Sequence, residues 1–178
     1  CKEDMIKPLS VGIQPDPITD YNVESIPGGA KIYFSVPQSE DLLYVKAEYE
    51  LVNGIKREVK SSLYKNYLIV DGFGKEGEYD VTLYAVAKGE VESVPSSIKI
   101  TTLMPPYISA YHSMEMQAVF GGITVSFKNE SEGNLVFQVL SIDSTKNWVP
   151  AYTHYTRFPE GYFSVRGYDT VPTIFGAF

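Results

Sequence analysis

The sequence lacks most of the features on which a catalytic or membrane-spanning assignment would rest. Its 178 residues include one cysteine, two histidines and one tryptophan, so an internal disulfide is excluded and a histidine-rich metal site is not expected. No apolar run approaches the ~20 residues that a membrane-spanning helix needs. The 22 acidic residues outnumber the 15 basic ones, which argues against a nucleic-acid partner. What is present is a hydrophobic content of 44%, enough for one or two domains with real cores.

The only cysteine is residue 1, which predicts a processed amino terminus because translation starts at methionine. Bacterial lipoprotein signals are cut directly before a cysteine that is then acylated, and two or more acyl chains anchor a protein stably. The next residues, Lys2, Glu3 and Asp4, resemble the signal that sends lipoproteins of Bacteroides-type bacteria to the outer face of the outer membrane. We therefore expect a surface protein lipidated at Cys1, which touches the membrane only through that lipid, with residues 1–17 as a tether. The alternative is that Cys1 marks an arbitrary boundary.

An internal repeat fixes the number of domains more firmly than length does. Three pairs of segments correspond in the same order, at offsets of 93, 93 and 95 residues: 28–34 with 121–127, 41–45 with 134–138, and 67–73 with 162–168. The sequence therefore predicts two tandem copies of one unit, a first domain at 18–103 and a second at 104–178, with Met104, Pro105 and Pro106 as the hinge.

Apolar residues in the first copy alternate with polar ones, which is typical of strands with one buried face. Asn53 and Gly54 separate two such runs and favour a tight hairpin turn. No window shows a convincing helical period. About seven strands in ~85 residues predict a β-sandwich. The expected inward rows are Ala30, Ile32, Phe34 and Val36; Leu43, Val45, Ala47, Tyr49 and Leu51; and Tyr79, Val81, Leu83, Ala85 and Ala87.

Two segments carry a resemblance to the fibronectin type III family. The run at 34–37 (FSVP) is similar to its strand B, and the run at 77–86 (GEYDVTLYAV) is similar to its strand F, with Tyr79 at the tyrosine-corner position. The strand-B tryptophan of that family and the cysteine pair of antibody domains are both missing. The resemblance implies an all-β protein of two tandem immunoglobulin/fibronectin type III-like β-sandwiches.

The second sandwich is expected to lack its last strand. Aligning the copies places Ile174 opposite Tyr79, so the sequence stops within the counterpart of strand F. We interpret the 178 residues as a truncated portion of a longer protein. The alternative is strand donation, in which a neighbouring chain completes the sandwich.

The inventory for catalysis is thin. His112 and His154 show no metal-ligand spacing, and no nucleophile-elbow, Walker or dinucleotide-binding pattern is present. We predict no enzyme activity, no catalytic residue, no cofactor and no metal.

The segment 147–162 is richer in aromatic residues than packing demands, because it holds the only tryptophan and four other aromatic residues. Sugars present flat C–H faces that stack on such rings, beside hydroxyls that need polar partners. The alternative is packing, because Tyr152 and Tyr155 differ in strand parity, and the same residue types also anchor protein interfaces. The candidate ligand-binding residues are Trp148, Tyr152, His154, Tyr155 and Arg157.

More narrowly, the whole chain resembles uncharacterised two-sandwich surface lipoproteins encoded beside glycan-uptake genes in Bacteroides-type bacteria. The residues that carry this resemblance, besides the amino terminus, are Arg166-Gly167-Tyr168 and Ile174-Phe175-Gly176. It implies a non-catalytic outer-surface lipoprotein of a glycan-acquisition system that binds or positions carbohydrate. The alternative is an adhesion, protein-interaction or spacer module of the cell envelope, which would contact envelope proteins and no sugar.

Overall fold

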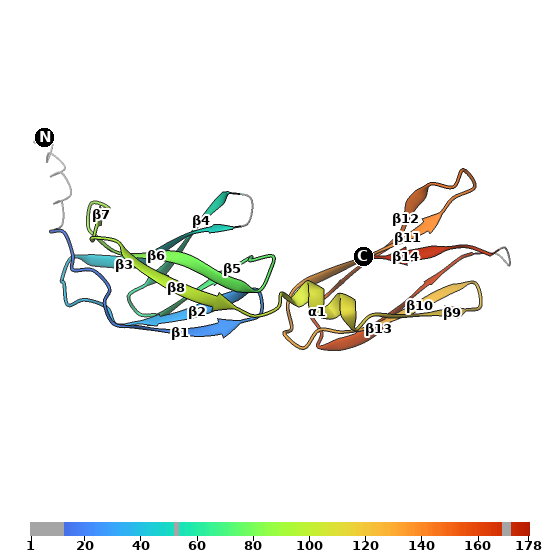
Figure 1. Ribbon diagram of the computed structural model, residues 1–178, viewed down its shortest axis with the longest axis horizontal. Coiled ribbons are helices and arrows are strands. Elements are labelled where there is room, and N and C mark those ends of the chain that lie inside the picture. Colours follow the sequence, from blue (N-terminus) through green and yellow to red (C-terminus); the bar gives the residue numbers. More distant parts are fainter. Residues whose placement is uncertain (1–12, 52–53, 169–171) are drawn as a thin grey trace, which may run out of the picture. The chain divides into compact units, whose positions relative to one another are not determined.

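The computed structural model describes residues 13–51, 54–168 and 172–178 (Figure 1). Cys1, Lys2, Glu3 and Asp4 lie outside these residues, and so does Asn53. The chain divides into two compact units, Cys1–Leu103 and Met104–Phe178. Nearly all regular structure is β-strand, and no helix in the described ranges is long and apolar enough to cross a membrane.

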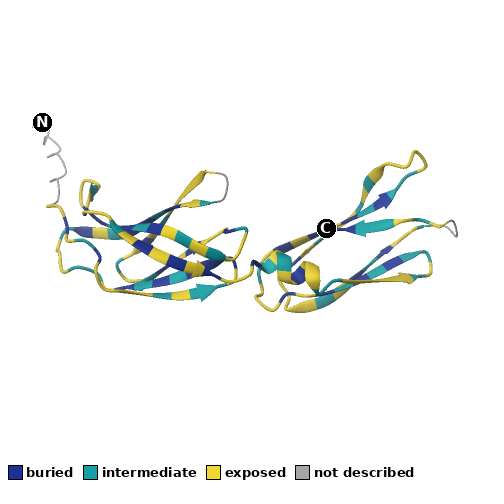
Figure 2. Cartoon of the chain, viewed as in Figure 1, coloured by how far each residue is buried: buried dark blue, intermediate teal, exposed yellow. Residues whose placement is uncertain are grey.

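The first unit consists of two antiparallel sheets. One sheet has the order β1-β2-β5, with β1 (Tyr21–Ile26), β2 (Gly29–Phe34) and β5 (Tyr67–Asp71). The other has the order β4-β3-β6-β7, with β4 (Ile55–Ser62), β3 (Leu42–Leu51), β6 (Gly77–Ala87) and β7 (Val91–Glu92), and β8 (Ser96–Thr102) also pairs with β6. Buried and exposed residues alternate along these strands, as Figure 2 shows.

The predicted inward rows are confirmed in β2 and β6, but one residue of the row in β3 is wrong. Leu43 is 42% exposed, whereas its neighbour Leu42 is 5% exposed and belongs to the core. A register shift between Leu42 and Tyr44 reverses the alternation there. The tyrosine corner is confirmed, because the Tyr79 hydroxyl donates to the carbonyl oxygen of Lys75 at 3.0 Å.

The second unit repeats the two-sheet arrangement. Its sheets have the orders β13-β10-β9 and β12-β11-β14. The elements are α1 (Pro106–His112), β9 (Glu115–Val119), β10 (Gly122–Lys128), β11 (Leu135–Ile142), β12 (Trp148–Thr156), β13 (Glu160–Arg166) and β14 (Phe175–Ala177). The fold class of two tandem fibronectin type III-like sandwiches is therefore confirmed. The helix α1 was not expected, since seven residues are too few to establish a period, although proline at its start is favourable.

A glycine pair marks the same place in both units and explains the clearest part of the repeat. The first glycine of each pair, at 28–29 and at 121–122, has a positive φ, 68° and 74° respectively. A side chain on the second glycine would overlap the carbonyl oxygen of a facing strand, Val70 in the first unit and Val165 in the second. Both positions therefore require glycine for steric reasons.

The sheet that contains β14 has fewer strands than its counterpart in the first unit. In the first unit β6 pairs with β3 on one side and with β7 and β8 on the other. In the second unit β14 pairs with β11 alone among the described residues. Gln138 and Phe178 extend this ladder by exchanging two backbone hydrogen bonds of 3.0 Å.

Candidate binding face of the second unit

The outer face of the β12-β11-β14 sheet brings together two of the five candidate residues. Trp148 pairs with Ile142, and Tyr155 pairs with Val136, on the side of β11 that points away from the core. Trp148 is 49% exposed and Tyr155 is 74% exposed. Seven positions separate them, so simple alternation would put them on opposite faces. The register shift between Val139 and Leu140 changes the parity and places both on one face.

Trp148 rests across the sheet rather than standing out from it. A Cβ atom on Gly176 of β14 would lie 3.3 Å from two atoms of the six-membered ring of Trp148. Since Trp148 belongs to β12, its ring reaches over β11 to the opposite strand. One side of the ring is therefore supported by backbone, while about half of the side chain remains exposed. Gly176 makes this arrangement possible by having no side chain.

The turn that precedes Trp148 is held by one carboxylate. Oδ1 of Asp143 accepts hydrogen bonds from the backbone N–H of Thr145 at 2.8 Å, the Thr145 hydroxyl at 2.7 Å and the backbone N–H of Asn147 at 2.9 Å. The hydrogen bond from the Thr145 hydroxyl, followed by that from Asn147, lowers the pKa of Asp143. These bonds hold the backbone at Asn147, the residue before Trp148, and so restrict the position of the Trp148 Cα atom.

Polar side chains lie between the two exposed rings. Gln138 of β11 pairs with Thr153 of β12, and both are exposed on the same face as Trp148 and Tyr155. Counting along β12, the backbone positions of Trp148 and Tyr155 are separated by roughly 20 Å. A ligand that contacts both rings must therefore be extended, and it would pass an amide and a hydroxyl on the way.

Tyr152 and His154 lie on the opposite side of β12. They pair with Val139 and Phe137, which are both buried. The His154 ring stacks on Phe163 with centroids 4.4 Å apart, and the Tyr152 ring lies 5.7 Å from Phe163. These two side chains therefore cover the edge of the core between the sheets, as the packing alternative proposed.

The last candidate residue, Arg157, and the remaining aromatic residues of the segment lie elsewhere. Arg157 and Phe158 are exposed beyond the end of β12. Tyr162 is exposed on β13, in the other sheet. Sequence reasoning missed Gly176, Gln138 and Thr153. The signal that could have indicated the shifted register is Pro150, because proline within a strand favours an edge or a bulge.

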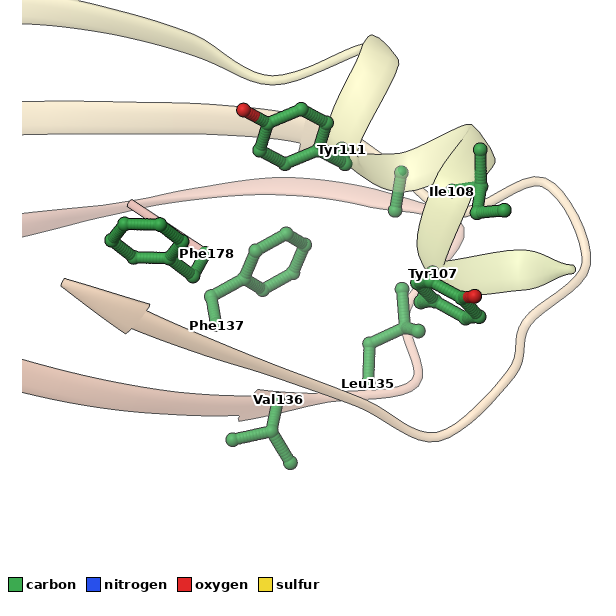
Figure 3. A pocket seen from close by; sticks show the side chains of 8 residues that line it. Tyr107, Ile108, Tyr111, Leu135, Val136, Phe137 and Phe178 are labelled. Atoms are coloured by element: carbon green, nitrogen blue, oxygen red, sulfur yellow. The ribbon is translucent and has the colours of Figure 1, made fainter. Parts of the chain in front are cut away.

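A hollow lies between α1 and the start of β11 (Figure 3). Its cavity volume is about 380 Å³. Figure 3 shows Tyr111, Phe137 and Phe178 gathered around it, while Val136 points away. The lining residues, none of which carries a charge, are Tyr107, Ile108, Ala110, Tyr111, Leu135, Val136, Phe137 and Phe178. This apolar groove provides no acid–base pair and no metal ligand set.

Neither unit shows an assembled catalytic or metal centre in the part of the chain that the structure describes. No group of three or more His, Cys, Asp or Glu side chains there is arranged to hold a metal ion. His112 is exposed on α1, and His154 packs on Phe163. The outer face around Trp148 therefore offers rings for stacking and polar side chains for hydrogen bonding.

Comparison with known proteins gives the two units separate family matches. Residues 15–102 match the family "Domain of unknown function (DUF4959)", and residues 103–178 match "Domain of unknown function (DUF5126)". No curated protein matches the chain.

Solved structures similar to the chain include three from chicken. A segment of two fibronectin type III domains of tenascin is 19% identical, with 92% of this chain and 99% of that one covered, at a TM-score of 0.46. The interferon gamma receptor alpha chain is 12% identical, with 93% and 89% covered, at 0.41. The FN1–FN3 domains of CNTN1 are also 12% identical, with 88% and 56% covered, at 0.41.

Proposed function

We propose that this chain is a non-catalytic carbohydrate-binding module that captures an extended glycan on the outer face of the β12-β11-β14 sheet. The observation that carries the proposal is the placement of Trp148, whose ring rests over Gly176 and remains half exposed. A ring supported from below offers a flat apolar surface for a sugar without a large cost in side-chain ordering. Tyr155 supplies a second ring on the same face, with Gln138 and Thr153 between them.

The proposal places the module on the cell surface. Lipidation of Cys1, the Lys2-Glu3-Asp4 signal and attachment to the outer membrane would present the sheet to polysaccharides outside the cell. The resemblance to surface lipoproteins encoded beside glycan-uptake genes supports a role in glycan acquisition. Mass spectrometry of the protein isolated from its native membrane would test this part independently, since an unmodified Cys1 thiol would contradict it.

Trp148→Ala tests the site most simply. We expect it to weaken binding to an extended polysaccharide at least tenfold, because the sugar ring loses the aromatic surface on which it stacks. Affinity electrophoresis in gels that contain candidate polysaccharides measures the effect. Tyr162→Ala is the matched control, because Tyr162 is an exposed aromatic residue on the other sheet and should leave binding unchanged.

Gly176→Val separates the platform from the mere presence of a tryptophan. The added side chain would occupy the space beneath the Trp148 ring and lift it from the sheet. We expect a loss of binding close to that of Trp148→Ala, although every residue that would touch the glycan is still present. Full retention of binding by Gly176→Val would contradict the role assigned to the flat ring.

The apolar groove beside α1 favours a second candidate function, a protein-interaction module. Tyr107 and Tyr111 of α1 line this groove, and both are more than half exposed. An apolar segment of a neighbouring protein, or of a second copy of this chain, could pack against them. Size-exclusion chromatography and crosslinking at low concentration test self-association of this kind, and a clean monomer would contradict it.

A further inference from the structure

The outer face of the β1-β2-β5 sheet in the first unit gathers two aromatic rings and two lysines. Tyr33 of β2 pairs directly with Tyr67 of β5, and their ring centroids are 6.0 Å apart. Lys31, two residues before Tyr33, lies on the same face because strand residues alternate. The set is separate from the Trp148 face, since it belongs to the other unit.

Both ammonium groups are directed at the same ring. Nζ of Lys31 lies 4.2 Å from the centroid of the Tyr67 ring and 4.7 Å from that of Tyr33. Nζ of Lys65 lies 5.0 Å from the centroid of Tyr67. The Tyr67 ring therefore has two ammonium groups close to it, and their charges attract an anion.

Local carboxylates leave the two lysines largely available. The ion pairs found among the described residues involve Lys46, Arg57, Lys60 and Lys88, and neither Lys31 nor Lys65 is among them. Glu24 lies across from Lys31 on β1; its carboxylate accepts the Tyr33 hydroxyl at 3.0 Å and keeps its negative charge, so it offsets part of the positive charge of this face. The hydrogen bond between Lys31 and Tyr33 raises the pKa of Lys31, so this lysine is charged at any physiological pH.

We propose that this face is a second glycan site, specific for an acidic oligosaccharide whose carboxylate draws Lys31 and Lys65 away from the rings, so that its own ring can stack on Tyr33 or Tyr67. The combination of two adjacent aromatic rings, tilted by 53° to each other, with two cations fits a sugar that carries both an apolar face and a negative charge. The positive charge stands out on a chain whose net charge is −7. This site does not depend on the Trp148 face, so either proposal can fail alone.

The test uses oligogalacturonate as the acidic probe and an uncharged glucan oligomer of equal length as its counterpart. Isothermal titration of the Trp148→Ala variant, which lacks the site proposed in the second unit, should show that the acidic probe binds at least tenfold more tightly than the neutral one. Lys31→Gln and Lys65→Gln should each weaken this binding about three- to tenfold. Lys99→Gln, which removes an exposed lysine of β8 that makes no aromatic contact, should change it less than twofold.

Four results would overturn the proposal. Equal losses in Lys99→Gln and Lys65→Gln would show that only the overall charge matters. Equal affinity for the neutral oligomer would remove the role of the carboxylate. Anionic phospholipid vesicles that bind while oligogalacturonate does not would indicate a membrane surface instead. Loss of oligogalacturonate binding in Trp148→Ala, with Lys31→Gln unaffected, would place the acidic sugar in the second unit.

Discussion

Individual side chains in this protein are placed by neighbours that lie far from them in sequence. Lys46 of β3 is buried on the outer side of its sheet, where it pairs with Glu48 at 2.8 Å and with Glu92 of β7 and lies over the Tyr84 ring. Burial alone would lower the pKa of Lys46, but hydrogen bonds and charges from both glutamates outweigh it and raise the pKa. The short strand β7 is therefore tied to the sheet by a charge as well as by backbone pairing.

Removing both carboxylates should destabilise the fold, because Lys46 would then be buried without a charged partner. We expect Glu48→Gln/Glu92→Gln to lower the free energy of unfolding by about 1 to 3 kcal/mol, because Lys46 loses its charged partners while its burial is unchanged. Urea unfolding measures the difference. Glu58→Gln is the control, since its partner Lys60 is exposed and such pairs contribute less than ~1 kcal/mol. An equal effect of both variants would contradict this account.

Asp143 gives the second prediction at this scale, a dependence on acid pH. A carboxyl whose pKa is lower in the folded state stabilises that state above its unfolded pKa, which is about 4, and the stabilisation is lost as the pH falls through the folded value. The turn should therefore loosen in acid, and the emission of Trp148, the only tryptophan, should report it. Asp143→Asn should abolish this acid transition in emission. Circular dichroism at each pH separates the local change from unfolding.

At the scale of strands, the repeat is easiest to explain where backbone approaches backbone. The second glycine of each pair, Gly29 and Gly122, lies against a carbonyl oxygen that leaves no room for a methyl group. Both units have glycine at this position because the two strands approach each other closely there. The same reasoning does not extend to Gly121, where a side chain would lie 3.5 Å from the carbonyl oxygen of Tyr168, an ordinary contact, and where the requirement is a positive φ that asparagine can also adopt.

Gly29→Ala and Gly122→Ala should each lower the stability of their own unit by about 2 kcal/mol or more, because the facing strand must move. Gly121→Asn is the matched control and should cost less than ~1 kcal/mol, because a side chain there meets only an ordinary contact. Trp148 emission follows the second unit alone, whereas circular dichroism follows both. We expect Gly122→Ala to shift the emission transition in urea and Gly29→Ala to leave it in place. A control variant as unstable as Gly29→Ala would contradict the steric explanation.

The strands could largely be predicted from the sequence, whereas the binding face could not. Alternation identified the inner residues of β2 and β6 because both strands are regular along most of their length. It failed at Leu43, and it does not reveal that Trp148 and Tyr155 share a face, since one shifted residue in a ladder reverses every side chain beyond it. The Trp148 ring crosses β11 to reach Gly176 of β14. Since β12 and β14 are distant in sequence, no local sequence pattern predicts this contact.

At the scale of the whole molecule, each unit is stabilised by its own core. The buried cluster of the first unit runs from Ile18 to Ile100, and that of the second runs from Ala110 to Ala177, with no shared residue. The two proposed glycan faces are also divided between the units. Under the two proposals, one unit would bind a neutral sugar by stacking and the other would recognise an acidic sugar.

The most direct test of the account is a titration of Trp148 fluorescence with extended neutral polysaccharides. Because Trp148 is the only tryptophan and its ring is the centre of the proposed site, binding should change its emission in a saturable way. Gly176→Val, which keeps the tryptophan but displaces its ring, should abolish the saturable change. If the emission of the unaltered protein is insensitive to every polysaccharide tested, or if Gly176→Val responds as strongly, the central claim is contradicted.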